Sequence, residues 1–297
     1  MAEGKNNLNI INLIKKMHDV FDEDDVEKQR QNQEHVASIL RPGKDIEISP
    51  FSLAHMDCEW VKPSEVHRKR PVILYCHGGG YTSGSIEYAK SITLKLAKIC
   101  MMDIMAFNYR LAPENVYPAA SDDALEAWNH LMYLGYAARD VIVMGDSAGG
   151  NLALNLVLRL INEKRMLPKG VVLLSPWTDM TCTNEAYIKY KEKDPILTPE
   201  YIYKSRDSYL AEHDSHDYMV SPIYADLKDF PPTYIQVGTN EILLGDSIEL
   251  YKAMKKAGVK VNLEKFNGMW HVFQMSPFAN SVKATKKIAE FIFELYG

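Results

Sequence analysis

Residues 141–164 read VIVMGDSAGGNLALNLVLRLINEK, an apolar run, a glycine-containing turn and a second, longer apolar segment. The apolar run VIVM predicts a buried β-strand, and the apolar periodicity after the glycines predicts a helix. Between them, GDSAG at 145–149 fits the pattern G-x-S-x-G. As a bare pentapeptide this is compatible with an ordinary glycine turn. A strand, a tight turn and a helix in this order are the context in which the pattern presents a nucleophilic serine, here Ser147.

Strand-like and helical stretches alternate along most of the chain. Strands are expected at 55–61, 72–76, 103–108, 141–144, 171–174, 233–237 and 259–264. Helices are expected at 85–100, 120–135, 150–164, 245–257 and 279–296. Largely apolar strands that alternate with helices predict an α/β fold, with a mostly parallel central sheet flanked by helices on both faces. The first strands come before the helices begin to alternate, so antiparallel pairing is possible for them.

Two regions interrupt this alternation. Residues 1–50 are expected to form two helices, at 8–21 and 26–40, ahead of the strands. Residues 178–220 are rich in Tyr, Lys and Asp and make a connection between strands that is far longer than usual. We interpret both as helical cap segments, the second inserted into a catalytic domain that spans 51–297.

A glycine-rich loop, HGGG at 77–80, follows the predicted strand at 72–76. Consecutive glycines let backbone N–H groups approach the oxygen that becomes negative during acyl transfer. The alternative is a phosphate-binding loop, because Gly78, Gly80 and Gly84 resemble a dinucleotide fingerprint. Their spacing is one residue too long, and no acidic ribose ligand stands in the expected place. The loop therefore favours an oxyanion hole.

Four blocks in sequence order resemble the hormone-sensitive-lipase-like family of esterases. The blocks are HGGGY at 77–81, NYRLAPENVYPAA at 108–120, GDSAGGN at 145–151 and SPIYADLKDFPPTYIQVG at 221–238. The resemblance implies a capped α/β-hydrolase fold that acts on esters with short to medium acyl chains. It also implies an oxyanion hole formed by the N–H groups of Gly79, Gly80 and Ala148, with Gly78 shaping the loop.

The resemblance further implies a catalytic triad in the chain order serine, acid, histidine. His271 follows the last predicted strand, where the family places its base, although Val272 stands where the family usually has glycine. Alignment with the family puts Glu241 at the acid position, whereas its rival Asp246 is expected in the first turn of the next helix. A serine hydroxyl needs a base to take its proton, and that base needs a carboxylate to fix its tautomer. Ser147, Glu241 and His271 are therefore expected to be catalytic.

Five large side chains flank these loops and are expected to wall a small acyl pocket: Tyr81, Trp177, Met269, Trp270 and Phe273. Such a pocket predicts a serine carboxylesterase that prefers short acyl groups. An amidase or deacetylase using the same serine remains an alternative. A ligand-binding protein on the same fold is a further alternative, which the presence of all three candidate catalytic residues disfavours.

Composition restricts the partners of the chain. Its net charge of −5 gives no reason to expect nucleic acid or an anionic membrane. The four cysteines form no C-x-x-C pair, so neither a zinc site nor a redox motif is indicated. A small-molecule ester is the expected partner, and a homodimer is left open. The sequence shows no secretory signal and no membrane-spanning run, so we expect a cytoplasmic protein.

Two polar clusters resemble metal sites, His213 to Asp217 and Asp22 to Asp25. Both are expected to be solvated cap residues, because no third ligand completes a site. No metal and no other cofactor are expected. Tyr109 and Arg110 are expected to brace the loop near the site.

Overall fold

The structure, a computed structural model, describes residues 26–37, 43–67 and 71–297. Eight strands within these ranges form one sheet in the order β1-β2-β4-β3-β5-β6-β7-β8. The strands are β1 (Ile46–Leu53), β2 (Met56–Pro63), β3 (Val72–Cys76), β4 (Asp103–Phe107), β5 (Val141–Asp146), β6 (Gly170–Leu174), β7 (Thr233–Gly238) and β8 (Val261–Phe266). Strand β2 pairs antiparallel with β1 and β4, and all other pairs are parallel. The predicted α/β fold with a mostly parallel sheet is confirmed.

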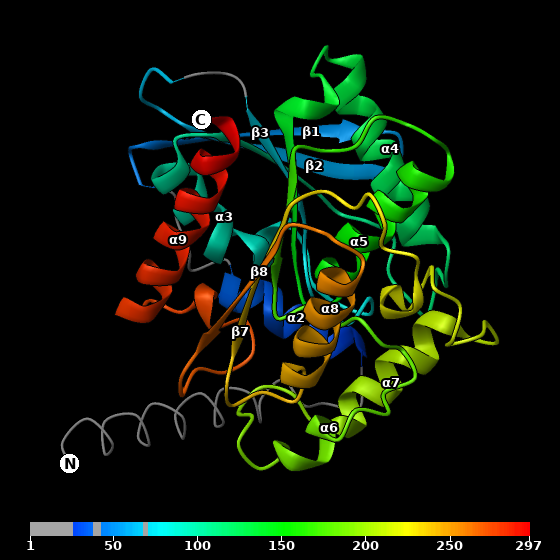
Figure 1. Ribbon diagram of the computed structural model, residues 1–297. Helices are drawn as coiled ribbons and strands as arrows, with labels where there is room; N and C mark the ends of the chain where they lie inside the picture. The colour runs from blue at the N-terminus through cyan, green and yellow to red at the C-terminus, as the bar shows by residue number, and fades with distance from the viewer. Residues whose placement is uncertain (1–25, 38–42, 68–70) are drawn as a thin grey trace.

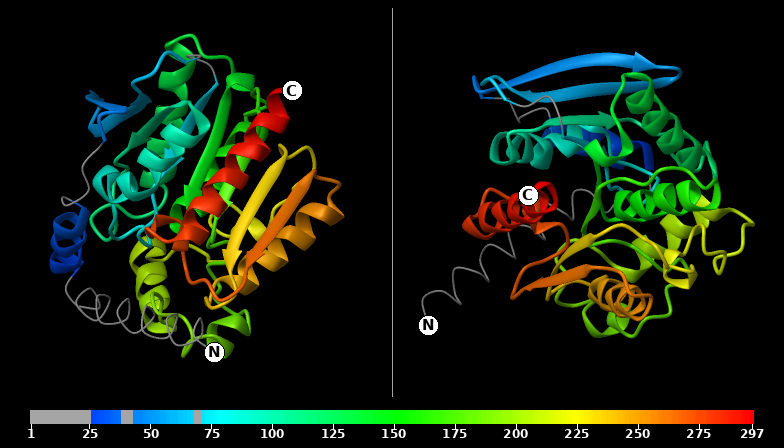
Figure 2. Two further views of the ribbon diagram at one scale, coloured as in Figure 1. Left: turned by 90° about the vertical axis from the view of Figure 1, so that its left-hand side faces the viewer. Right: turned by 45° about the horizontal axis from the view of Figure 1, so that its top comes forward.

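Helices cover both faces of the sheet. The longer ones are α2 (Val26–Ala37), α3 (Ile86–Cys100), α4 (Ala119–Tyr133), α5 (Ala148–Asn162), α7 (Pro199–Leu210), α8 (Leu244–Lys256) and α9 (Ala279–Tyr296). Helices α3 and α9 pack on one face, and α4, α5 and α8 pack on the other (Figures 1 and 2). In the described ranges, none of these helices combines the length and apolar character that crossing a membrane requires.

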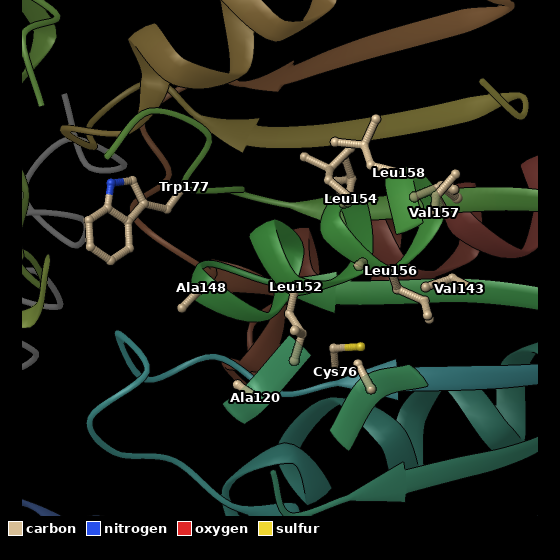
Figure 3. Packing of buried hydrophobic residues seen from close by; sticks show 14 of the residues in the cluster. Cys76, Ala120, Val143, Ala148, Leu152, Leu154, Leu156, Val157, Leu158 and Trp177 are labelled. Carbon is tan, nitrogen blue, oxygen red and sulfur yellow. The ribbon is translucent and has the colours of Figure 1, made fainter. Parts of the chain in front are cut away.

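The central strands are buried on both sides because their residues alternate between two apolar layers. In β3, Leu74 and Cys76 join the layer under α4 and α5, whereas Ile73 and Tyr75 join the layer under α3 and α9. Figure 3 shows the first layer, in which side chains of α5 lie beside Cys76 and Val143. Because both layers pack tightly on the central strands, the ends of β3, β5, β6 and β7 are held in fixed positions.

Strand β1 was not expected from the sequence. It pairs with β2 along its whole length, from Ile46 opposite Pro63 to Leu53 opposite Met56. Its residues alternate between exposed and half-buried, as suits an edge strand, so it has no continuous apolar run that would reveal it. The predicted domain boundary at residue 50 falls inside this strand, and the sheet begins at Ile46.

The 178–220 segment contains α6 (Ala186–Lys189) and α7, which lie at the bottom of Figure 1. Helix α7 packs on the glycine-rich loop, since the rings of Tyr209 and Tyr81 stack with centroids 3.7 Å apart. Helix α2 contacts the same loop, because Arg30 donates a hydrogen bond to the carbonyl oxygen of Thr82 (2.8 Å). The helix expected at 8–21 lies outside the described residues.

A close approach between β3 and α5 fixes the turn at 145–149. A Cβ atom on Gly149 would lie 2.1 Å from the carbonyl oxygen of Cys76 and 2.4 Å from that of His77. A Cβ atom on Gly145 would lie 2.1 Å from the carbonyl oxygen of Gly149. Backbone atoms cannot move aside as flexible side chains do, so glycine is required at both positions.

We expect Gly149→Ala to lower the free energy of unfolding by about 3 kcal/mol, because the new methyl group collides with the backbone. Chemical denaturation measures this loss. Gly258→Ala is the control without a collision: its φ of 81° disfavours alanine, unlike the helical backbone of Gly149, but no atom lies within 4 Å of the added methyl group. That variant should lose only about 1 kcal/mol. A loss in Gly149→Ala no larger than that of the control would contradict the role of the close approach.

Candidate active site

Ser147 lies at the junction of β5 and α5 in a strained backbone conformation. Its φ is 53° and its ψ is −121°, a region that residues with a side chain rarely adopt. Its N–H donates to the carbonyl oxygen of Leu174 (2.9 Å), and its own carbonyl oxygen accepts from the N–H of Trp177 (3.1 Å). These bonds hold the turn that presents the Ser147 side chain at the carboxyl ends of the strands.

His271 and Glu241 face each other at the same edge of the sheet. Nδ1 of His271 lies 4.0 Å from Oε1 of Glu241. Both atoms are buried, and within the described ranges neither has a hydrogen-bond partner. The distance is longer than a hydrogen bond but within the range of an ion pair. The other ring nitrogen of His271, Nε2, is left for a different partner.

The end of β6 brings the loops of Ser147 and His271 together. Leu174, the last residue of the strand, accepts the N–H of Ser147. The next residue, Ser175, accepts the N–H of Val272 at its Oγ (3.3 Å). Consecutive residues of one strand end therefore contact the nucleophile turn and the residue that follows the histidine.

Burial disfavours the charged forms of both members of the acid–base pair. It raises the pKa of Glu241 to about 8 and lowers the pKa of His271 to about 4. The carboxylates of Asp194 and Asp146 oppose the lowering at His271. The imidazole is consequently neutral at pH 7, which is the form that accepts a proton.

Ser175 holds the carboxylate of Glu241 in place. Its Oγ donates a hydrogen bond to Oε2 of Glu241 (2.9 Å), and the N–H of Gly238 donates to the same oxygen (3.3 Å). Because Oε2 has these two donors, Oε1 is the oxygen that turns toward His271. Sequence reasoning assigned no role to Ser175, although a polar residue directly after a buried strand marks the functional edge of a parallel sheet.

Val272 adopts the left-handed conformation that glycine favours. Its φ is 48° and its ψ is 39°, which is unfavourable for a β-branched residue. Such a conformation costs about 1–3 kcal/mol and persists only where the surroundings impose it. The loop thus keeps a backbone suited to glycine although the side chain at this position is valine.

Asp246, the alternative candidate for the catalytic acid, bonds to residues other than His271. It lies in the first turn of α8, as expected, and is 1% exposed. Its Oδ2 accepts the N–H groups of Thr178 (2.8 Å) and Asp179 (3.2 Å). Of the two candidate acids, Glu241 is the one within 4.0 Å of His271.

The glycine-rich loop presents free N–H groups beside the serine turn. In the described part of the chain, the N–H groups of Gly79, Gly80 and Ala148 donate to no acceptor. Gly79 and Gly80 have φ values of 117° and 63°, and a Cβ atom on Gly79 would lie 2.2 Å from the carbonyl oxygen of Ser83. The N–H of Gly78 is bonded to Asp146 (3.0 Å), so Gly78 anchors the loop and is not a free donor.

Asp146 ties the nucleophile turn to the glycine-rich loop. Its Oδ1 accepts from the hydroxyl of Tyr75 (2.7 Å) and from the N–H of Gly78, and its Oδ2 accepts from the hydroxyl of Tyr88 (3.4 Å). Burial raises the pKa of this carboxyl to about 6. The sequence contains Asp146 within GDSAG, but its partners lie far away in sequence and could not be inferred.

Tyr109 braces the glycine-rich loop as expected, whereas Arg110 binds residues of helix α4. The Tyr109 hydroxyl donates to the carbonyl oxygen of His77 (2.9 Å), and the two rings stack with centroids 4.1 Å apart. Arg110 forms an ion pair with the buried carboxylate of Asp123 (2.8 Å). Burial lowers the pKa of His77 to about 4, which leaves its ring neutral.

The five side chains expected to wall the acyl pocket are all buried. Tyr81, Trp177 and Phe273 are 0% exposed, whereas Met269 and Trp270 are 7% exposed. Tyr81 is held by Tyr209 and by a hydrogen bond to Asn151 (2.8 Å). Trp177 lies near Ala148 at the end of α5 in Figure 3. Their role in binding a substrate stays a prediction.

The histidines of the 178–220 segment pair with separate carboxylates. His213 contacts Asp217 (2.8 Å), and His216 contacts Asp214 (3.4 Å). Among the residues that the structure describes, no group of three or more His, Cys, Asp or Glu side chains could hold a metal ion. Asp22 to Asp25 lie outside the described residues.

The known proteins that this chain resembles are α/β-hydrolases, among them esterases. A family described as having the alpha/beta hydrolase fold matches residues 73–275. An esterase of Acinetobacter venetianus is 35% identical over 83% of this chain and 82% of its own length. An acetyl-hydrolase of Streptomyces hygroscopicus is 33% identical over 75% of this chain and 74% of its own length. The crystal structure of an esterase from the bacterial hormone-sensitive lipase family superposes with a TM-score of 0.93, at 30% identity and over 98% of both chains.

The strained serine turn, the glycine-rich loop and the eight-stranded sheet agree with these relatives. The chain therefore belongs to the α/β-hydrolase family, within its group of hormone-sensitive-lipase-like esterases.

Proposed function

We propose that the chain is a serine carboxylesterase in which Ser147 is the nucleophile, His271 the base and Glu241 the acid. The observation that carries this proposal is the pairing of Nδ1 of His271 with Oε1 of Glu241 beside the strained serine turn, two buried atoms that have no hydrogen-bond partner among the described residues. Structural carboxylates and imidazoles are normally hydrogen-bonded when buried. An unpartnered pair at the edge where Ser147 is presented is better explained by catalysis.

In the first half-reaction, Oγ of Ser147 attacks the ester carbonyl carbon while Nε2 of His271 takes the hydroxyl proton. The carbonyl oxygen becomes negative and binds the free N–H groups of Gly79, Gly80 and Ala148. The bond to the alcohol oxygen then breaks, His271 returns the proton to that oxygen, and the acyl group stays on Ser147. Whenever His271 has taken up a proton, its imidazolium favours the ionised form of Glu241.

In the second half-reaction, water takes the place of the alcohol. His271 removes its proton as the water oxygen attacks the acyl carbon, and the proton then passes to Oγ of Ser147. The products are a carboxylic acid and the free enzyme. The sequence of steps needs no cofactor.

We propose short- to medium-chain acyl esters of small molecules as substrates. The relative from Streptomyces hygroscopicus is an acetyl-hydrolase, which supports a small acyl group. Met269 and Trp270 precede His271 directly and pack in an apolar cluster with Phe273, which supports apolar surroundings for a small acyl group. An amidase or deacetylase would use the same residues, but no feature of the site favours it.

Ser147→Ala and His271→Ala should each lower kcat for a p-nitrophenyl ester by about 10⁶, because the serine and its base act as a unit. Ser121→Ala is a matched control: Ser121 is also buried and its hydroxyl bonds to Asn155 in another part of the core. This control should keep near-normal kcat. Near-normal turnover by either active-site variant would falsify the assignment.

Glu241→Gln should lower kcat by about 10⁴, because the amide cannot stabilise an imidazolium as a carboxylate does. Asp246→Asn should leave kcat nearly unchanged, because Glu241 is the acid within 4.0 Å of His271 and an amide oxygen can still accept the N–H groups of Thr178 and Asp179. Steady-state kinetics of both variants measure the two losses. The reverse ranking of the kcat losses would move the acid to Asp246.

Esters with acyl chains of about two to six carbons should be hydrolysed faster than longer ones, because a confined pocket excludes long chains. A panel of p-nitrophenyl esters run with the purified protein measures this preference. Matched anilides serve as the comparison for amidase activity. Fastest turnover of chains of about twelve carbons would contradict the proposed pocket, and faster turnover of the anilides would favour the amidase.

A further inference from the structure

Asp194 is a buried carboxylate that has no part in the reaction described above. It lies between α6 and α7 in the 178–220 segment and is 5% exposed. Its Oδ1 accepts the N–H groups of Ile196 (2.9 Å) and Leu197 (3.0 Å), which closes a tight turn. Local turns of this kind need only one carboxylate oxygen.

The second oxygen of Asp194 reaches a distant part of the chain. Oδ2 accepts the N–H of Ile242 (2.9 Å), the peptide group directly after Glu241. The side chain of Glu241 is fixed by Ser175 and Gly238, whereas this bond fixes its backbone. The loop of the acid is thus held from two sides, and one of them belongs to the inserted segment.

The turn at 194–197 also contacts the loop of the base. Ile196 packs against the apolar cluster that contains Met269, Trp270 and Phe273, the residues around His271. Ile196 packs against the main core as well. One short turn therefore lies against both loops whose relative position decides whether Glu241 faces His271.

We propose that Asp194 is a positioning residue for the acid–base pair: it ties the 178–220 segment to the peptide group after Glu241 and keeps the Glu241 carboxylate turned toward His271. This inference rests on the proposed function, in which Glu241 is the acid. Asp194 touches neither substrate nor reacting atoms. It acts through Glu241.

Asp194→Asn tests the proposal, because the amide offers one acceptor oxygen where the carboxylate offers two. We expect kcat for a p-nitrophenyl ester to fall by about 10- to 100-fold, as small displacements of catalytic groups do, with KM changed by less than about twofold. A fall in kcat alone indicates a lost transition-state interaction. A rise in KM with kcat unchanged would instead place Asp194 in substrate binding and overturn the proposal.

Asp246→Ala is the control for the loss of a buried anchor. Asp246 is also a buried carboxylate, but its Oδ2 alone accepts both N–H groups, from Thr178 and Asp179, so an asparagine could keep these bonds and alanine is needed to break them. Both variants should lose stability, and only Asp194→Asn should lose kcat. Rates are compared at a temperature at which circular dichroism shows both variants folded. Equal kcat losses would mean that any buried anchor has this effect, which overturns the proposal.

A double-mutant cycle with Glu241→Gln distinguishes action through the acid from a general loss of structure. If Asp194 acts through Glu241, adding Asp194→Asn to Glu241→Gln should lower kcat by less than about threefold further. Additive losses overturn the inference but leave the proposed function intact. A near-normal kcat of Glu241→Gln alone overturns the proposed acid and this inference with it.

Asp194→Ser provides the same test should the asparagine variant not fold. The serine hydroxyl can still accept from the N–H groups of the local turn, as serine does in such turns, but is too short to reach Ile242. Its kcat loss should match that expected for asparagine and should vanish in the same way when Glu241→Gln is present. A serine variant with normal kcat overturns the proposal.

Discussion

Three residues in the loops that follow β5, β6 and β8 adopt the left-handed backbone that glycine favours, and the geometry of the candidate site rests on them. Ser147, Ser175 and Val272 have φ values of 53°, 47° and 48°, although none of them is glycine. Each such residue costs about 1–3 kcal/mol and persists only because its neighbours impose the conformation. Hydrogen bonds from the strand ends impose it here. The carbonyl oxygen of Leu174 accepts the N–H of Ser147, that of Gln236 accepts the N–H of Ser175 (2.8 Å), and the Oγ of Ser175 accepts the N–H of Val272. Because Leu174 and Ser175 are consecutive, these hydrogen bonds connect the turn of Ser147 to the loop of His271 and set the relative position of the proposed nucleophile and base before a substrate arrives.

Desolvation gives this rigid arrangement its chemistry. Three carboxyl groups surround one imidazole, and burial raises the pKa of Glu241 to about 8 and those of Asp146 and Asp194 to about 6. The same burial lowers the pKa of His271 to about 4, so the resting imidazole is neutral at pH 7. In the proposed mechanism, a proton that leaves Ser147 creates a positive charge near these carboxyl groups, where the low dielectric strengthens the attraction.

The sequence predicted those parts of the site whose partners lie nearby in the chain. The serine turn and the glycine-rich loop follow directly from local backbone requirements, and helix periodicity located α3, α4, α5, α8 and α9 to within a few residues. Contacts between distant residues have no such local signal. Ser175 meets Glu241 across 66 positions, Gly78 meets Asp146 across 68, and Asp194 meets Ile242 across 48. Strand β1 escaped prediction for a different reason, since an edge strand with one half-exposed face lacks the apolar run that marks the central strands.

The 178–220 segment contacts both halves of the site, and this limits how it can act. Through α7 it covers the glycine-rich loop, because a Cβ atom on Gly80 would lie 2.8 Å from the hydroxyl oxygens of both Tyr201 and Ser205. Through Asp194 it holds the loop of the acid. A segment that only enclosed the substrate could move without disturbing the catalytic groups, but this one cannot, since the oxyanion loop and the acid share it as a support. If the proposed acyl pocket lies on this side, changes in the 178–220 segment that reshape it should also shift the loop of Glu241, so that selectivity and rate change together.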